Sequence, residues 1–287
     1  MKPSKIKVFS MFSGVGGFEL GFQQANLQTQ VVGFCEIDKY ASQILETKFK
    51  GIKNYGDATK INETKLPNFD ILVGGFPCQP FSMAGKRKGF DEARGTLFFD
   101  VARILAHKKP RNFILENVKG LLSHNKGKTF ETILGILSDL GYIVEWELLN
   151  SKNYGVPQSR ERVYIVGHLR GQSRSKVFSF RKSTEKSNQN PKLLTKNLGQ
   201  AQRVFSTNGV SVSIIALGGG QGAKTGLYKI PQGKTQIRRL TPIECERLQG
   251  FPDNWTEGLS DTQRYKCLGN AVTTNVIEWI GKQLYEC

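Results

Sequence analysis

The residue in this sequence most able to act as a nucleophile is Cys78, in the segment Gly74-Gly-Phe-Pro-Cys-Gln-Pro-Phe-Ser82. An apolar run from Asp70 to Gly74 precedes it and predicts a strand, so Cys78 falls at the carboxyl edge of a sheet, where ligands bind in such folds. Many cysteines are simply buried and inert, and that interpretation suits Cys35, which lies in an apolar strand. It suits Cys78 poorly, because a Pro-Cys-Gln-Pro loop cannot form the interior of a core strand.

A glycine-rich turn, Phe12-Ser-Gly-Val-Gly-Gly-Phe18, follows the first predicted strand, and Glu36 lies at the end of the next one. Glycines let the backbone turn tightly beside a ligand, and an acidic residue about 20 positions later can bind ribose hydroxyls. Glu19 occupies the third glycine position of the dinucleotide fingerprint, so a tight turn without a ligand stays open. Asp57 either accepts a hydrogen bond from an adenine amino group or belongs to a surface turn.

Between residues 5 and 169, short apolar runs alternate with amphipathic segments of helical length, the pattern of a parallel sheet covered by helices. Strands are predicted at Ile6–Met11, Gln30–Glu36, Asp70–Gly74, Asn112–Glu116, Ile143–Leu149 and Val163–Gly167. Helices are predicted at Phe18–Ala25, Lys39–Phe49, Leu97–Ala106, Thr129–Leu140 and Thr274–Leu284, with another that begins at Thr241-Pro-Ile-Glu. The pattern predicts an α/β fold with a doubly wound, mostly parallel sheet.

Positive charge is concentrated in one part of the chain. The net charge is +17, and residues 170–240 contain 14 basic residues and one acidic residue. This distribution is typical of a surface that binds a polyanion. A solvated basic loop is the alternative that charge alone leaves open.

The compartment is indicated by the cysteines and by the absence of long apolar stretches. Five cysteines are scattered along the chain, with no Cys-x-x-Cys pair and no apolar leader before them. That pattern favours a reducing cytoplasm. No stretch approaches the ~20 apolar residues of a membrane span, so we expect a soluble protein.

Eight motifs in order resemble those of the C5-cytosine DNA methyltransferases of bacterial restriction-modification systems, across nearly the whole chain. They are Phe12-Ser-Gly-Val-Gly-Gly, Glu36-Ile-Asp, Gly56-Asp-Ala-Thr, Pro77-Cys-Gln-Pro-Phe-Ser, Glu116-Asn-Val, Gln158-Ser-Arg-Glu-Arg-Val, Arg239-Leu-Thr-Pro through Gly250-Phe-Pro, and Gly269-Asn-Ala-Val. Any one of them could arise by chance, but eight in order could hardly do so.

The resemblance implies covalent catalysis by Cys78. A thiolate that adds to C6 of cytosine makes C5 nucleophilic toward a methyl sulfonium. By similarity Glu116 assists at N3, Arg162 holds the cytosine O2, and Arg160 supports the active-site loop and the thiolate. The base that removes the C5 proton is not evident, and bound water remains open. The target cytosine must be flipped out of the duplex to reach the thiol.

The resemblance also implies a Rossmann-like S-adenosylmethionine-dependent fold, with S-adenosylhomocysteine as product and no metal. The cofactor residues carried over from the family are Phe12, Gly14, Gly17, Glu36, Ile37, Asp57, Pro77, Leu97, Asn270 and Val272. The loop from Pro77 to Thr96 is expected to close over the DNA.

The family's layout predicts three parts of the chain. Residues 1–169 form the catalytic and cofactor-binding domain, residues 170–265 a basic target-recognition domain with its hinge, and residues 266–287 a segment that returns to the catalytic domain. Base recognition is assigned to residues 168–236 as one unit. There Ser213-Ile214 stands where many relatives have Thr followed by Leu, Val or Ile.

We expect a monomer that acts on double-stranded DNA with a short specific cytosine site, and a cognate endonuclease need not bind it. Zinc-dependent deaminases are excluded, because no His-x-Glu is present and Pro77-Cys78 lacks a second cysteine three positions on. A nicotinamide enzyme leaves the Pro-Cys loop unexplained. A non-catalytic DNA-binding relative is disfavoured, since Cys78, Glu116 and Arg162 are intact. An RNA (tRNA) cytosine methyltransferase stays the alternative, although the Pro-Cys-Gln-Pro loop and the basic segment favour DNA.

Overall fold

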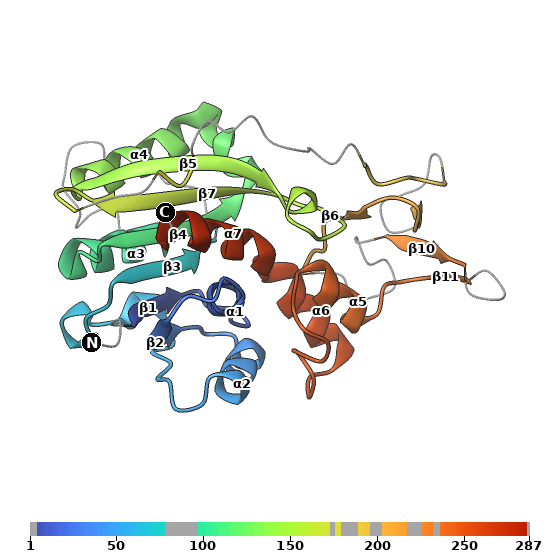
Figure 1. Ribbon diagram of the computed structural model, residues 1–287, viewed down its shortest axis with the longest axis horizontal. Coiled ribbons are helices and arrows are strands. Elements are labelled where there is room, and N and C mark those ends of the chain that lie inside the picture. Colours follow the sequence, from blue (N-terminus) through green and yellow to red (C-terminus); the bar gives the residue numbers. More distant parts are fainter. Residues whose placement is uncertain are drawn as a thin grey trace.

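The chain folds into a larger lobe built on a six-stranded sheet and a smaller lobe of short strands beside it (Figure 1). This computed structural model describes residues 5–77, 97–172, 176–178, 189–195, 203–216, 226–231 and 236–285. Cys78 and the loop through residue 96 lie outside the described residues.

The main sheet has the strand order β2-β1-β3-β4-β7-β5. Its strands are β1 (Ile6–Met11), β2 (Thr29–Cys35), β3 (Ile71–Gly75), β4 (Asn112–Val118), β5 (Tyr142–Asn150) and β7 (Glu161–Leu169). The first four in this order pair in parallel, which confirms the mostly parallel sheet. Strand β2 lies on one side of β1 and β3 on the other. The strand order therefore reverses at β1, and ligands bind at such a switch point in open α/β sheets.

Strand β7 runs antiparallel to both of its neighbours, β4 and β5. Residues 151–160 connect β5 to β7 and contain no α-helix. A parallel return needs a crossover of a dozen or more residues, so this short connection reverses the strand.

Helices cover both faces of the sheet, as in a three-layer α/β/α sandwich. They are α1 (Gly17–Gln24), α2 (Lys39–Lys48), α3 (Leu97–Lys108), α4 (Lys128–Asp139), α5 (Pro242–Leu248), α6 (Asp261–Asn270) and α7 (Thr274–Tyr285). Short 3-10 turns lie at Ala58–Lys60, Glu63–Lys65, Lys119–Leu122, His124–Gly127 and Ser151–Asn153. Of these helices, only α6 was not predicted from the sequence.

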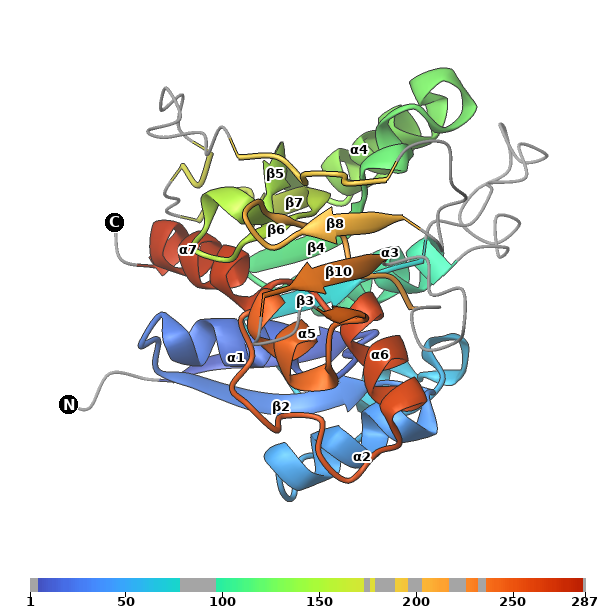
Figure 2. The same cartoon turned by 90° about the vertical axis from the view of Figure 1, so that its right-hand side faces the viewer.

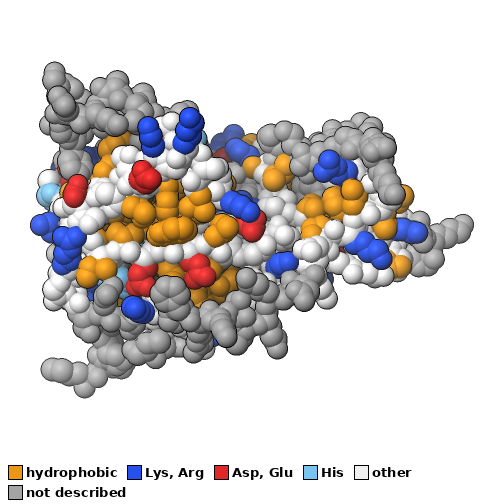
Figure 3. Space-filling view, turned by 90° about the horizontal axis from the view of Figure 1, so that it is seen from above, with side chains coloured by type: hydrophobic (Ala, Val, Ile, Leu, Met, Phe, Trp, Pro, Cys, Tyr) orange, Lys and Arg blue, Asp and Glu red, His pale blue; other side chains and the backbone are white. Residues whose placement is uncertain are grey.

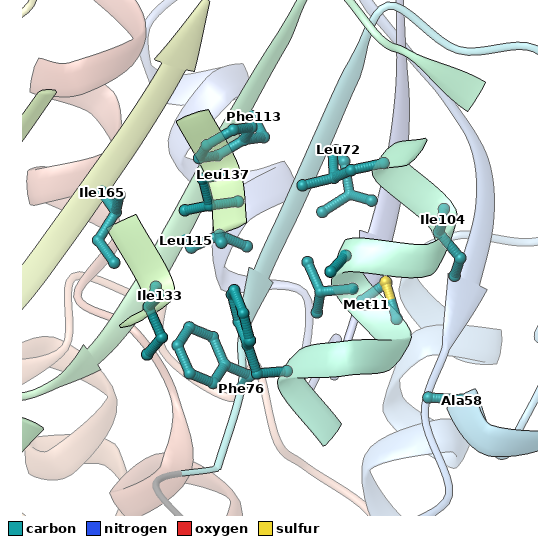
Figure 4. Packing of buried hydrophobic residues seen from close by; sticks show 14 of the residues in the cluster. Met11, Ala58, Leu72, Phe76, Ile104, Phe113, Leu115, Ile133, Leu137 and Ile165 are labelled. Carbon is teal, nitrogen blue, oxygen red and sulfur yellow. The ribbon is translucent and has the colours of Figure 1, made fainter. Parts of the chain in front are cut away.

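Each face of the sheet has its own apolar core. On one face α3 and α4 contribute Ile104, Ile133 and Leu137, which pack against Leu72, Phe113 and Leu115 of the strands (Figure 4). On the other face α1 and α7 pack together over β1, β3, β4 and β7. Successive side chains of a strand point to opposite faces, so the continuous apolar runs of β3 and β4 supply both cores.

The smaller lobe is built from short strands that stand in front of the main sheet in Figure 2. Its strands β8 (Val204–Ser206), β10 (Leu227–Ile230) and β11 (Gln236–Arg238) form one sheet, and β9 (Ser211–Val212) pairs with β6 (Gln158–Ser159). Helix α5 begins with the capping box expected from Thr241 and Glu244. It packs in a third apolar cluster that also contains Leu20 of α1 and Ile44 of α2.

Strand β5 is the outermost strand of the main sheet among the described residues, on the side viewed in Figure 3. Ile143 and Trp146 are exposed there, and Glu145 and Glu147 lie between and beside them. Charged side chains along an edge strand discourage pairing with another sheet. Within the described residues, no helix has the length and apolar character needed to cross a membrane.

Candidate active site

A cavity of about 410 Å³ opens at the carboxyl ends of β1 to β4. This volume lies within the usual range for small-molecule and cofactor pockets. The site residues predicted from sequence that line it are Phe12, Gly14, Glu36, Ile37, Asp57, Pro77, Leu97, Glu116, Arg160, Arg162 and Asn270. One cavity therefore brings together most of the residues predicted for catalysis and for cofactor binding.

The turn after β1 reaches the cavity through residues with positive φ. Phe12 has φ of 51° although it carries a side chain, and Gly14 has φ of 54°. A Cβ atom added to Gly14 would meet no atom within 4 Å, so the space above this glycine is open. Positive φ at a non-glycine residue has an energetic cost, and Phe12 is the described non-glycine residue that adopts it while lining the cavity.

Glu36 braces this turn through its side chain. One carboxylate oxygen, Oε2, accepts the backbone N–H of Gly14, and the other, Oε1, accepts that of Asp38, both at 2.8 Å. Burial raises the pKa of Glu36, while these two N–H groups oppose the shift. Each oxygen retains further acceptor capacity, as ribose hydroxyls require.

The neighbouring positions differ in what they offer a ligand. Ile37 is 75% exposed and lines the cavity, so its aliphatic side chain is accessible there. The Oδ1 atom of Asp57 is already occupied, because it accepts the backbone N–H and the hydroxyl of Thr59. An adenine amino group would therefore have to use Oδ2 of Asp57.

Two members of the predicted cofactor set, Gly17 and Val272, are absent from the lining of this cavity. A Cβ atom at Gly17 would lie 2.8 Å from Cγ2 of Val272. The two residues thus pack against each other, and the absent side chain at Gly17 lets the C-terminal segment approach α1. Both residues therefore lie on the side of the glycine turn that faces away from the cavity.

Glu116 and Arg162 form an ion pair inside the cavity. Nε of Arg162 lies 2.9 Å from Oε1 of Glu116, and both side chains are largely buried. Burial raises the pKa of Glu116, although the charges of Arg162 and Arg160 oppose the shift. A carboxyl group with a raised pKa holds a proton more readily near neutral pH, as a donor to a ring nitrogen must.

Arg160 is 2% exposed and connects three parts of the chain. Its guanidinium donates to the carbonyl oxygens of Ile214, Gly269 and Ala271, at 2.8 to 3.1 Å. Its Nε has no hydrogen-bond partner among the described residues. Burial, with a contribution from Arg162, lowers the pKa of Arg160 to about 10, so the group stays charged at neutral pH.

Asn117 is a site residue that the sequence analysis did not single out. Its side chain is buried and donates through Nδ2 to the carbonyl oxygen of Phe76 at 2.8 Å. This bond fixes the chain next to Pro77, which precedes Cys78 and lines the cavity. The signal was available in the Glu116-Asn-Val motif, where an amide beside a catalytic carboxylate is a candidate for positioning a loop.

Comparison with known proteins gives the family. The family model described as C-5 cytosine-specific DNA methylase matches residues 6–214 and 218–286. The chain belongs to this family. It is a methyltransferase of the class that modifies carbon 5 of cytosine in DNA.

The chain is similar over nearly its full length to type II methyltransferases of this family. It is 38% identical over 310 residues to M.HhaI of Haemophilus parahaemolyticus, covering 96% of this chain and 93% of that protein. It is 38% identical over 327 residues to M.HpaII of Haemophilus parainfluenzae, covering 98% and 90%. A Dnmt2 methyltransferase structure from S. pombe matches with a TM-score of 0.75 at 19% identity, covering 96% of this chain and 97% of that one, which supports the fold.

Proposed function

We propose that this C-5 cytosine methylase works on double-stranded DNA through a covalent bond between Cys78 and C6 of a flipped cytosine. The observation that carries the proposal is the cavity in which Glu116, Arg162 and Pro77 lie beside the Glu36 turn. A single pocket can then hold a methyl donor and a pyrimidine next to each other, so that their reacting atoms meet without diffusion.

The reaction begins when the Cys78 thiolate forms a bond to C6 of the cytosine. Glu116 donates its proton to N3, which accepts the electron density that the addition pushes into the ring. Arg162 orients Glu116 by donating its Nε–H to Oε1 at 2.9 Å, and it binds the cytosine O2. The buried positive charges of Arg160 and Arg162 favour the thiolate over the thiol.

The second half restores the aromatic ring. C5 takes the methyl group, loses its own proton to a base or to bound water, and the C6–S bond breaks so that Cys78 leaves as thiolate. The proton on N3 returns to Glu116.

S-adenosylmethionine would supply the electrophilic methyl group in this cavity. The residues fit such a molecule: Glu36 offers carboxylate oxygens for ribose hydroxyls, and Ile37 offers an exposed apolar surface for the adenine ring. Phe12, Gly14, Asp57, Pro77, Leu97 and Asn270 would complete the contact surface, and Gly17 and Val272 would support the turn from behind. Among the described residues, no group of three or more His, Cys, Asp or Glu side chains is placed to bind a metal ion.

The similarity to type II methyltransferases supports a role in a restriction-modification system. The chain would act there as a monomer on a short specific site. The basic residues 170–240 would supply the DNA contacts, and residues 266–287 would complete the catalytic domain. The described cysteines Cys35, Cys245 and Cys267 are free, which fits a reducing cytoplasm.

Trapping with 5-fluorocytosine tests the mechanism directly. Fluorine at C5 cannot leave as the proton does, so the enzyme should stay bound to such DNA as an adduct that survives denaturing electrophoresis. Peptide mapping should place the bond at Cys78. Cys78→Ser should form no adduct while still binding cofactor, whereas Cys287→Ser, a matched substitution, should trap normally.

Two results would contradict the proposal: no adduct with the unmodified enzyme, or full turnover by Cys78→Ser. The substrate is identified by offering the same sequence as duplex DNA and as RNA. Bisulfite sequencing of a plasmid methylated by the enzyme then gives the recognition site.

A further inference from the structure

Helix α6 touches two parts of the protein at once. On the recognition side, the Tyr265 hydroxyl donates to the carbonyl oxygen of Leu240 at 2.7 Å. Gly269 packs so tightly on the segment 215–216 that an added Cβ would lie 2.2 Å from the backbone nitrogen of Ala216. On the other side, Lys266, Cys267, Gly269 and Asn270 line the cavity.

Lys266 joins α6 to the opposite wall of the cavity. Its Nζ lies 2.6 Å from Oδ2 of Asp38, a residue 228 positions earlier in the chain. The two side chains are 47% and 27% exposed, so the ion pair sits at the rim of the cavity and not in its interior.

Asp38 lines the cavity directly after the predicted cofactor residues Glu36 and Ile37. Its Oδ1 caps α2 by accepting the N–H groups of Tyr40 and Ala41, and its own N–H donates to Glu36. A chain of contacts therefore runs from Gly14 through Glu36 and Asp38 to Lys266. From Lys266, helix α6 extends this chain of contacts to Leu240 and the smaller lobe.

We propose that Lys266 is a positioning residue that clamps α6 to the cofactor wall, so that cofactor binding and DNA binding depend on each other through its ion pair with Asp38. The inference rests on the proposed function, because it requires that the cavity hold the cofactor. Occupancy of the cavity fixes the Glu36–Asp38 segment, the ion pair fixes α6, and α6 fixes the backbone at 215–216. Such coupling is reciprocal for the two binding equilibria.

The test measures binding, not turnover. S-adenosylhomocysteine affinity is measured by calorimetry, and DNA affinity is measured with and without S-adenosylhomocysteine on a duplex carrying the methylated site. For Lys266→Met we expect a loss of S-adenosylhomocysteine affinity of about 1.5- to fivefold, the range for a partly exposed ion pair. The ratio of the two DNA affinities should move toward one, and Lys266→Arg should restore both values.

A matched control removes a similar ion pair elsewhere. Lys282 pairs with Glu278 within α7 at 2.7 Å, with exposures of 38% and 27%, away from the cavity lining. Lys282→Met should leave the affinity ratio unchanged. Thermal unfolding of each variant confirms that the comparison is between folded proteins.

A double-mutant cycle separates this role from a direct contact of Lys266 with the cofactor. Asp38→Asn keeps an oxygen that can cap α2 and removes the charge. If the ion pair acts as proposed, Lys266→Met has little further effect in the Asp38→Asn protein. An equal loss in both backgrounds, or no loss in either, would overturn the inference. Failure of the unmodified enzyme to bind S-adenosylhomocysteine would instead refute the proposed function.

Discussion

At the scale of single residues, Glu116 carries the prediction closest to the chemistry. Glu116→Gln keeps the shape of the side chain but cannot transfer a proton to N3. Loss of a general acid typically costs ~10²- to 10⁴-fold in rate, so kcat should fall by that order. Binding of S-adenosylhomocysteine should persist. Glu161→Gln is the matched control, since Glu161 lies on β7 and pairs with Lys119 at the surface.

Single-turnover methylation with labelled cofactor gives the rate of the chemical step for both variants. Equal rates for Glu116→Gln and the unmodified enzyme would remove the carboxyl from the mechanism. If the rate of Glu161→Gln fell as far as that of Glu116→Gln, any change of charge on this side of the sheet would have the same effect on the rate.

Glu19 is a second buried carboxyl, and it lies outside the mechanism. It is 1% exposed, and burial raises its pKa to about 7. Its two oxygens have no hydrogen-bond partner among the described residues. The folded chain therefore keeps a proton that the unfolded chain has released between about pH 4.5 and about pH 7.

This pKa shift predicts that stability falls as pH rises through that window, because the folded state binds more protons than the unfolded state. The shift contributes on the order of 3 kcal/mol to the free energy of unfolding. This contribution is present below the pH window and lost above it. Glu19→Gln mimics the neutral acid, so it should match the unmodified protein at pH 5 and be more stable at pH 8. Urea unfolding at both pH values checks this, with Glu46→Gln on the exposed face of α2 as control. Parallel pH curves for Glu19→Gln and the unmodified protein would contradict the assignment.

At the scale of elements, the sequence predicted the six strands of the main sheet and most helices because their apolar periodicity is strong, but it did not predict the short strands β6 and β8 to β11. Helix α6 was missed because only Cys267, Leu268 and Gly269 are buried among its mostly polar residues. It contacts Asp38, Leu240 and Arg160, which lie in distant parts of the chain, so no local sequence pattern predicts these contacts. The reversed β7 was not foreseen either, since an apolar run reads the same in both directions.

The site was predictable to a similar extent. Motif resemblance located Glu116, Arg160 and Arg162, which lie in one cavity. It did not distinguish residues that line the cavity from Gly17 and Val272, which pack behind it, because that difference depends on backbone approach. Lys266 could not be found from sequence, since its partner Asp38 lies 228 positions away.

The end of β3 offers a test of how closely two strands position the Glu116 carboxyl, which we propose to be catalytic. A Cβ added at Gly75 would lie 3.1 Å from Oε2 of Glu116, closer than ordinary contact. Gly75→Ala should therefore displace the carboxyl by a few tenths of an ångström. Small misplacements at a reacting centre cost up to ~10²-fold in rate, so we expect kcat to fall by ten- to a hundredfold with little change in the unfolding temperature.

Gly135→Ala is the matched control for this glycine substitution. A Cβ there meets no atom within 4 Å, and the residue lies inside α4. The change should stabilise the protein by up to about 1 kcal/mol and leave kcat unchanged. Normal activity in Gly75→Ala would show that the Glu116 carboxyl tolerates movement.

At the scale of the whole molecule, most of the segment with excess positive charge coincides with the smaller lobe. Residues 170–240 hold 14 of the 41 basic residues and one acidic residue. Residues 176–178 of this segment pack on the α/β lobe against α7, whereas its described residues from 189 onward lie in the small lobe, with Lys192 and Lys229 exposed. The α/β lobe holds the cavity, so chemistry and polyanion binding are assigned to adjacent lobes, with Arg160 and α6 between them.

DNA affinity should consequently fall steeply with salt, because each phosphate that the protein neutralises releases condensed counterions. Replacing Lys192 and Lys229 with glutamine should reduce the slope of log K against log salt by about two, near one unit for each phosphate that a lysine no longer neutralises. Replacing Lys50 and Lys65, both exposed on the α/β lobe, makes the same change in net charge and should leave the slope unaltered. Fluorescence anisotropy between about 50 and 200 mM salt, a range over which phosphate binding dominates the affinity, measures all three proteins. Equal slopes for the two double variants would mean that DNA responds to the total charge of the molecule, and the assignment of recognition to the small lobe would then be wrong.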